Sequence, residues 1–329
     1  GMDSELSCRE QISRHLQGLL SLQADIDLNK YFLLVMNNDQ TISVIDPLLG
    51  VNGITQLYAM IVLKERGEDW ARSNDGKQLF VTMPRADAVA VVDLEKFQVI
   101  KTLETGTNPV RTALQPDGRY LWVGNDGRTE GQSGVTVVDA QNYEVIRYIP
   151  TGAGHHEIAF SDESLHAFVT NSIAGTVSVI DTQTLEKRAD IKTGKSPVAV
   201  QYSPLSKRAY VASQSGVITV VDATGNETTE TMATDAGLVS LRVSPDGRWG
   251  FAANIERNVV EVIDTASGAF VHRFDVGGKP HQFAFTDNYA YVRHLGTPDV
   301  MLIPLAQLGK RATPGLKRIP IGNSAPGEY

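Results

Sequence analysis

The chain of 329 residues carries a formal net charge of −8 and a single cysteine, Cys8. This acidic balance argues against a nucleic-acid surface, since phosphate binding needs clustered lysines and arginines, and one thiol permits neither an internal disulfide nor a cysteine-based metal site. No apolar stretch approaches the roughly 18 residues of a membrane-spanning helix, so we expect no membrane span.

The first twenty residues have an amphipathic pattern. Their apolar positions are Leu6, Ile12, Leu16, Leu19 and Leu20. This spacing among charged and polar residues predicts a short helix that begins after Ser4. We therefore assign residues 1–20 to an N-terminal helical extension.

From residue 21 onwards, the chain repeats a unit of about forty residues. The clearest copy contains the strand-like segments His156–Phe160, Ala167–Asn171 and Thr176–Asp181, then a last run that ends at Thr193, with turn residues between them. Four short strands in a period of this length are typical of one blade of a β-propeller.

An aspartate preceded by Val or Ile closes the third segment of each copy. It recurs as Asp46, Asp93, Asp139, Asp181, Asp222 and Asp264, with spacings of 47, 46, 42, 41 and 42 residues. A seventh, weaker copy ends at Pro304, which stands in place of the aspartate. The sequence therefore predicts an all-β fold, a seven-bladed β-propeller over residues 21–321 with four antiparallel strands in each blade. The tail at 322–329 begins another blade-entry loop and stops; it either folds over the ring or marks a cut before further sequence, and we favour the cut.

Turn chemistry separates the two faces of the predicted ring. Asp-Gly turns at 73–76, 115–118 and 244–247 predict hairpins on one face. The loops that enter the blades lie on the opposite face, and several have the form Gly-x-x-Pro. That face also receives an insertion at 125–134 in blade three and the Arg293–Asp299 loop of blade seven.

Several conspicuous residues have structural roles in this scheme. We expect the repeated aspartates to accept hydrogen bonds from turn amides. We expect Trp70, Trp122 and Trp249 to pack between blades.

Part of the unit resembles a known repeat. Phe168-Val169-Thr170-Asn171, followed by 177–181, is similar to the YVTN-type β-propeller repeat, and related copies occur at 121–125, 210–213 and 251–254. The resemblance covers about residues 21–321 and implies a propeller fold and a periplasmic or extracellular location. Proteins with such repeats include surface-layer proteins, lactonase-like enzymes and the d1-haem domain of nitrite reductase, so the resemblance alone does not assign a function.

The entry loops share a register that gathers polar side chains at one mouth of the central channel. His156 in blade four and His281 in blade seven occupy equivalent positions, with His155 beside the first and His294 on the Arg293–Asp299 loop. Loops on a rigid scaffold and channel mouths are where ligands bind. The predicted ligand-binding residues are His155, His156, Glu157, His281, Gln282, Arg293, His294, Asp69 and Arg111.

Histidine at such a mouth suits a haem-iron or metal ligand, or an acid–base group near neutral pH. In the nitrite-reductase-like relatives a haem lies over this mouth and a histidine supplies an axial bond. The resemblance thus implies His156 and His281 as candidate haem-iron ligands. The alternative is that these imidazoles hydrogen-bond a neighbouring blade, and that the acidic and basic residues beside them form ion pairs between blades.

Three functions remain open at this point. The chain lacks Gly-x-Ser-x-Gly, Walker-type and His-Glu-x-x-His motifs, and we assign no catalytic residue. The leading hypothesis is a non-enzymatic scaffold that binds a protein partner or a small ligand at the channel mouth. The alternatives are a haem-binding, redox-associated propeller and a lactonase-like hydrolase that would use Arg293, His294 and Glu157.

Overall fold

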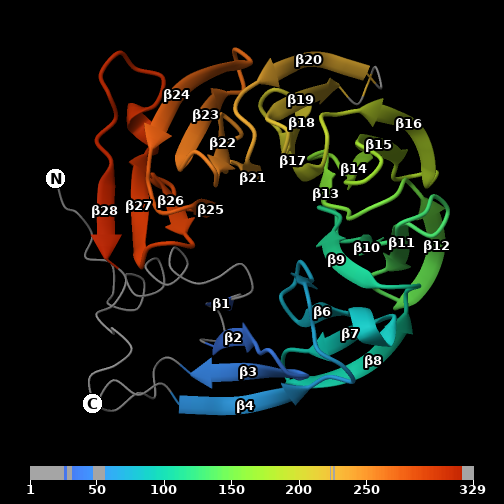
Figure 1. Cartoon of the computed structure of the whole chain (residues 1–329). Helices are drawn as coiled ribbons and strands as arrows, with labels where there is room; N and C mark the ends of the chain where they lie inside the picture. The colour runs from blue at the N-terminus through green and yellow to red at the C-terminus, as the bar shows by residue number, and fades with distance from the viewer. Residues whose placement is uncertain (1–25, 28–31, 47–55, 223, 225–226, 321–329) are drawn as a thin grey trace.

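Seven four-stranded antiparallel sheets form a ring in the computed structural model of the protein (Figure 1). The structure describes residues 26–27, 32–46, 56–222, 224 and 227–320. The predicted seven-bladed, all-β fold is confirmed. The predicted N-terminal helix and the tail at 322–329 lie outside the described residues.

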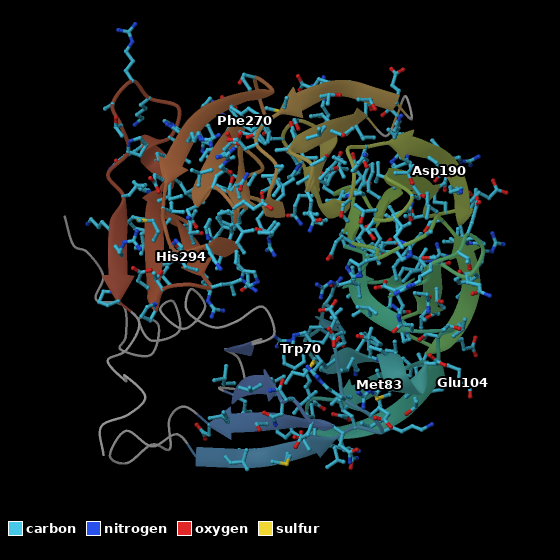
Figure 2. The ribbon with its side chains drawn as sticks, in the orientation of Figure 1. Trp70, Met83, Glu104, Asp190, Phe270 and His294 are labelled. Carbon is cyan, nitrogen blue, oxygen red and sulfur yellow. The ribbon has the colours of Figure 1, made fainter. Side chains whose placement is uncertain are left out.

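Each blade takes four consecutive strands. The strands, blade by blade, are β1 (Ile26–Asp27), β2 (Phe32–Met36), β3 (Thr41–Asp46) and β4 (Gln56–Val62); β5 (Trp70–Arg72), β6 (Gln78–Met83), β7 (Ala88–Asp93) and β8 (Gln98–Glu104); β9 (Pro109–Leu114), β10 (Tyr120–Asn125), β11 (Gly134–Asp139) and β12 (Glu144–Pro150); β13 (Ile158–Phe160), β14 (His166–Asn171), β15 (Thr176–Asp181) and β16 (Glu186–Lys192); β17 (Pro197–Ser203), β18 (Arg208–Ser213), β19 (Val217–Asp222) and β20 (Glu227–Ala233); β21 (Leu238–Val243), β22 (Trp249–Asn254), β23 (Val259–Asp264) and β24 (Ala269–Asp275); and β25 (Pro280–Phe285), β26 (Tyr289–His294), β27 (Asp299–Pro304) and β28 (Lys317–Pro320). The first strand of each blade borders the central channel and the fourth forms the outer rim (Figure 1). Figure 2 shows Trp70 near the channel and Glu104 and Asp190 at the rim.

The helical content of the described chain is small. It consists of two short 3₁₀ turns, Pro84–Ala86 and Leu305–Gln307. Within the described ranges, none of the helices has the length and hydropathy needed to cross a membrane.

The repeated aspartates have the predicted structural role. The Oδ1 atom of Asp181 accepts hydrogen bonds from the backbone amides of Gln183 and Thr184 at 2.9 and 3.0 Å. Equivalent hydrogen bonds from turn amides are accepted by Asp93, Asp139, Asp222 and Asp264. These amides lie beyond the sheet ladder and need an acceptor, which explains why the same residue type recurs in blade after blade.

The Asp-Gly turns are also as predicted. At 115–118, the amide of Gly118 donates to the carbonyl of Gln115 at 2.8 Å, and Gly118 has φ +75°. This left-handed conformation favours glycine. Equivalent bonds close the turns at 73–76 and 244–247.

Packing between adjacent blades forms the hydrophobic core. Six buried clusters join blades one and two, two and three, and so on to six and seven, with one cluster for each pair. Trp122 belongs to the cluster of blades three and four, Trp249 belongs to that of blades six and seven, and Trp70 packs against that of blades one and two. The tryptophans therefore pack between blades, as the sequence predicts.

Phe168→Ala tests this account of the core. Phe168 is fully buried between blades four and five and stacks on Tyr202 with ring centroids 5.9 Å apart. Loss of a buried phenylalanine costs about 3–5 kcal/mol, because the transfer free energy is lost and a cavity remains. We expect a large fall in the denaturant midpoint of Phe168→Ala and little change for Ile173→Ala, whose side chain is exposed on the same blade. Equal midpoints for the two variants would contradict the account.

Candidate functional site

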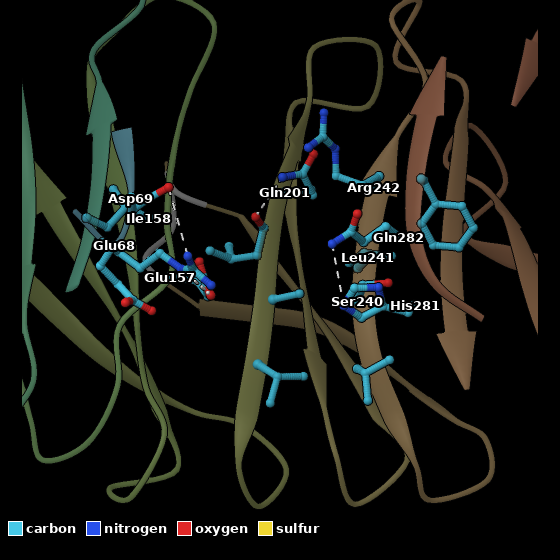
Figure 3. A pocket seen from close by; sticks show the side chains of 16 residues that line it. Glu68, Asp69, Glu157, Ile158, Gln201, Ser240, Leu241, Arg242, His281 and Gln282 are labelled. Atoms are coloured by element: carbon cyan, nitrogen blue, oxygen red, sulfur yellow. Dashed lines mark hydrogen bonds and ion pairs between the residues drawn. The ribbon is translucent and has the colours of Figure 1, made fainter. Parts of the chain in front are cut away.

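A cavity of about 520 Å³ occupies the central channel. Its walls come from blades two to seven, where the first strand of each blade and the residues just before it face inward (Figure 3). A volume of this size lies within the roughly 300–1,000 Å³ typical of small-molecule and cofactor sites. The channel is therefore the candidate site.

Charged side chains of blades two, three and four form a connected network on one wall. The Nε atom of Arg111 on β9 lies 3.1 Å from Oε1 of Glu157, and its NH1 lies 3.9 Å from Oδ1 of Asp69. The backbone amide of Thr112 donates to the other carboxylate oxygen of Asp69 at 2.9 Å. Burial raises the pKa of Asp69, whereas Arg111 and the amides oppose this effect. The network thus has the inter-blade ion pairs that the sequence left open as an alternative.

His155 extends the network toward the insertion of blade three. Its Nδ1 lies 2.7 Å from Oδ2 of Asp126, and its Nε2 lies 3.0 Å from Oε1 of Glu157. Burial opposes the charged form of the ring, but the bonds to these two carboxylates outweigh it and raise the pKa of His155 to about 9. His155 is therefore an imidazolium at neutral pH and has no lone pair for a metal.

His156 is a structural residue in this fold. Its side chain is fully buried, with Nε2 2.7 Å from the hydroxyl of Ser133 and Nδ1 2.8 Å from the backbone carbonyl of Thr170. Ser133 belongs to the blade-three insertion, so the ring joins neighbouring blades. Both ring nitrogens are engaged, which leaves none to face a ligand.

His281 has a different environment, although it stands at the equivalent position in blade seven. Its half-buried ring lines the cavity (Figure 3). Within the described chain, its one polar contact is a long one of 3.4 Å from its Nε2 to Nε2 of Gln282. Burial and the positive charge of Arg293 lower the pKa of His281, so the ring is neutral at pH 7. A neutral imidazole that faces a cavity is the form that binds metals.

The two remaining predicted residues of blade seven lie in a strand, and the loop position inferred from the sequence is wrong. Arg293 and His294 are the last residues of β26, which continues further than expected. The side chain of His294 is fully buried, with Nδ1 3.2 Å from the backbone carbonyl of Asp299, and it does not line the cavity. Arg293 lies beside Gln282, with NH1 3.5 Å from its Oε1.

Four polar residues of the cavity wall were missed from the sequence. They are Glu68, which precedes β5, Gln201 on β17, and Ser240 and Arg242 on β21. The hydroxyl of Ser240 is buried and has no hydrogen-bond partner among the residues that the structure describes. Strand alternation could have found Gln201 and Arg242, because they lie two residues beyond Ala199 and Ser240, the positions equivalent to Glu157 in blades five and six, and so share their face.

Arg242 is a cation without a partner. Across the residues that the structure describes, its guanidinium makes no hydrogen bond or ion pair. Water reaches the side chain, but the surrounding blades restrict hydration and lower the pKa of the guanidinium. Within the described chain, the cavity therefore has two unlike sides, a paired and mainly acidic network on blades two to four, and the unpaired guanidinium of Arg242 with the neutral imidazole of His281 on blades six and seven.

Comparison with known proteins identifies the family. A model of the cytochrome D1 haem domain matches residues 74–294, more than half of the chain. The chain belongs to this family. Among solved structures, the hydrazine synthase of Kuenenia stuttgartiensis superposes with a TM-score of 0.60 at 23% identity, over 73% of this chain and 77% of that chain, a likeness of fold alone. No curated protein matches the chain.

The raised pKa of His155 predicts a pH-dependent stability. The folded-state pKa of His155, about 9, lies above the ordinary value of 6.5, so protonation of the ring stabilises the fold. This contribution is fully present below about pH 6.5 and is lost as the pH rises through 9. We expect the melting temperature of the wild type to fall between pH 7 and 9.5 by more than that of His155→Gln. His166→Gln, a substitution of the same size on β14, is the matched control and should follow the wild type. Parallel curves for all three proteins would contradict the assignment.

Proposed function

We propose that this protein binds a d1-type haem in its central channel and acts in redox chemistry. The observation that carries the proposal is the neutral, cavity-facing imidazole of His281 in a chain of the cytochrome D1 haem domain family. Family membership favours this function over the scaffold hypothesis.

The residues of the cavity fit such a group. His281 offers a nitrogen for the iron, and Arg242 offers a guanidinium for peripheral carboxylates. The hydroxyl of Ser240 offers a buried polar atom that has no hydrogen-bond partner in the described part of the chain. Val198, Val239, Leu241 and Phe283 supply an apolar lining for a macrocycle.

In this proposal the bound haem supplies a redox-active iron, and the chain supplies its binding and environment. His281 would hold the iron from blade seven, and Arg242 would pair with a carboxylate of the ligand. Arg293 adds positive charge beside His281. The network of Asp69, Arg111 and Glu157 keeps the opposite wall fixed, because its charges are already paired.

Two finer points of the proposal follow from the sequence resemblance. We assign the repeats to the YVTN type, and we place the protein in a periplasmic or extracellular location. Both stay predictions. We do not propose the lactonase-like function, because two of its three residues, Arg293 and His294, do not line the cavity, and His294 is buried against Asp299.

A haem titration tests the proposed function. We expect d1 haem, or protohaem as a more accessible probe, to bind the wild type with a shifted Soret band. His281→Ala should lose the features of histidine-ligated haem, because no other described histidine presents a free nitrogen to the cavity. His272→Ala, on the rim strand β24, is the control and should match the wild type. A flat titration of the wild type with both haems would overturn the proposal.

Arg242 should contribute to affinity through charge. A hydrogen bond to a charged group contributes about 1.5–3 kcal/mol, so Arg242→Gln should weaken haem binding by roughly 10- to 100-fold. Arg188→Gln on the rim strand β16 removes the same charge far from the cavity and should leave the dissociation constant unchanged. Equal changes in the dissociation constant for the two substitutions would show that the net charge of the protein, and not a contact of Arg242 with the haem, determines the affinity.

A further inference from the structure

The outermost strand of blade one differs in chemistry from the other rim strands. β4 reads Gln-Leu-Tyr-Ala-Met-Ile-Val and has neither a charged residue nor a proline, whereas β8, β12, β16, β20, β24 and β28 all carry charged residues. Charges and prolines on an edge strand keep one sheet from pairing with another. β4 therefore lacks the protection that the other six rim strands have.

Exposed apolar side chains gather on the same part of the rim. In the described chain, the exposed large hydrophobic residues of the rim strands all lie on blades one to three: Leu57, Tyr58, Met60 and Val62 on β4, Ile100 on β8, and Val145, Ile146 and Tyr148 on β12. The four on β4 are exposed by 52%, 56%, 48% and 61%. Apolar side chains that gather in this way mark an interaction surface.

The backbone of β4 also has a free edge. Within the described ranges, β4 pairs with β3 alone, and it forms the outer edge of its sheet, away from the central channel (Figure 1). The N–H and C=O groups on the outer side of an edge strand can pair with a further strand. β4 therefore combines an open backbone edge with exposed apolar side chains.

We propose that this protein self-associates through β4, which pairs in antiparallel orientation with β4 of a second copy across a twofold axis. The two first blades then form one continuous sheet of eight strands. Such a pair is complementary by symmetry, because each donor of one copy meets the matching acceptor of the other. The contact lies on the rim, so it leaves the channel open and does not depend on haem binding.

The charge of the protein favours a second copy at β4 over one at any other rim strand. The chain has a net charge of −8, so two copies repel each other. Identical strands paired around a twofold axis also bring their own charges together, and like charges on opposing strands are destabilising. β20, for example, would place Glu227 and Glu230 near their own counterparts. β4 has no charge to oppose, and the second copy supplies the apolar, uncharged strand that this edge fits.

Side chains of the two copies meet on both faces of the extended sheet. The twofold axis of an antiparallel pair is perpendicular to the sheet, so the same face of each copy lies on the same side. Met60 and Val62 share one of these faces. Tyr58 lies toward blade two, where Phe32 and Phe97 already hold its ring with centroids 4.5 and 5.8 Å away. A side chain held in place before association loses little freedom when the copies meet.

The size of the surface predicts a weak, reversible dimer. Four side chains that are each about half exposed offer roughly 400 Å² per copy, about half of the ~800 Å² that each partner buries in a standard interface. The paired backbone edge adds to this area. We therefore expect a dissociation constant in the micromolar range or weaker.

Sedimentation velocity of the full chain from about 1 μM to about 1 mM tests the proposal. We expect the wild type to shift from monomer to dimer over this range. Met60→Lys with Val62→Lys places like charges on the edge and should remain monomeric at every concentration. Ile173→Lys with Leu205→Lys adds the same charge at exposed turns of blades four and five and should dimerise as the wild type does. A wild type that stays monomeric would overturn the proposal and leave β4 to a different partner, as would a folded Met60→Lys, Val62→Lys variant that still dimerises.

A disulfide test locates the contact without adding charge. Tyr58 and Met60 flank the middle residue of β4, so the two copies of each residue lie near the twofold axis. In a Cys8→Ser background, which removes the single native cysteine, at least one of Tyr58→Cys and Met60→Cys should form a disulfide-linked dimer after mild oxidation. Ile173→Cys, an exposed position on blade four, should not. Linked dimers that form equally in all three variants, or in none of them, would contradict pairing through β4.

Discussion

Packing of each blade against the next through apolar faces is the constraint on which the rest of the structure depends. Six clusters of buried side chains fix the blades side by side, and this fixes the first strand of each blade at the channel. Residues that share one register in those strands then converge, although hundreds of positions separate Asp69 from His281 and Gln282. The site is a consequence of ring closure, since no single blade contains it.

The charged side chains divide the channel into two sides that differ in how well they can bind an anionic ligand. On blades two to four, Asp69, Arg111, Glu157 and His155 satisfy one another, so an anionic ligand gains little there. On blades six and seven, Arg242 has no partner among the described residues, and His281 is held neutral by burial and by Arg293. The chain belongs to the cytochrome D1 haem domain family, and under the proposed function this second side would supply the iron ligand and a cation for a carboxylate.

Much of the fold was predictable from the sequence because its determinants are local. The aspartate that caps the turn after the third strand, and the alternation of apolar residues, repeat with each blade. The site was less predictable. His156 and His281 are equivalent in register, but Ser133 of a distant insertion reaches His156 and occupies its Nε2, a contact no spacing reveals. The loop position of His294 was wrong because β26 continues to that residue.

The most direct test of the central claim is magnetic resonance of the ferric haem complex prepared with ¹⁵N-histidine-labelled protein. The account predicts hyperfine coupling between the iron and a histidine nitrogen, and loss of that coupling in His281→Ala. Coupling that persists in His281→Ala, or bound haem with no histidine coupling in the wild type, would contradict the assignment of His281 as the iron ligand.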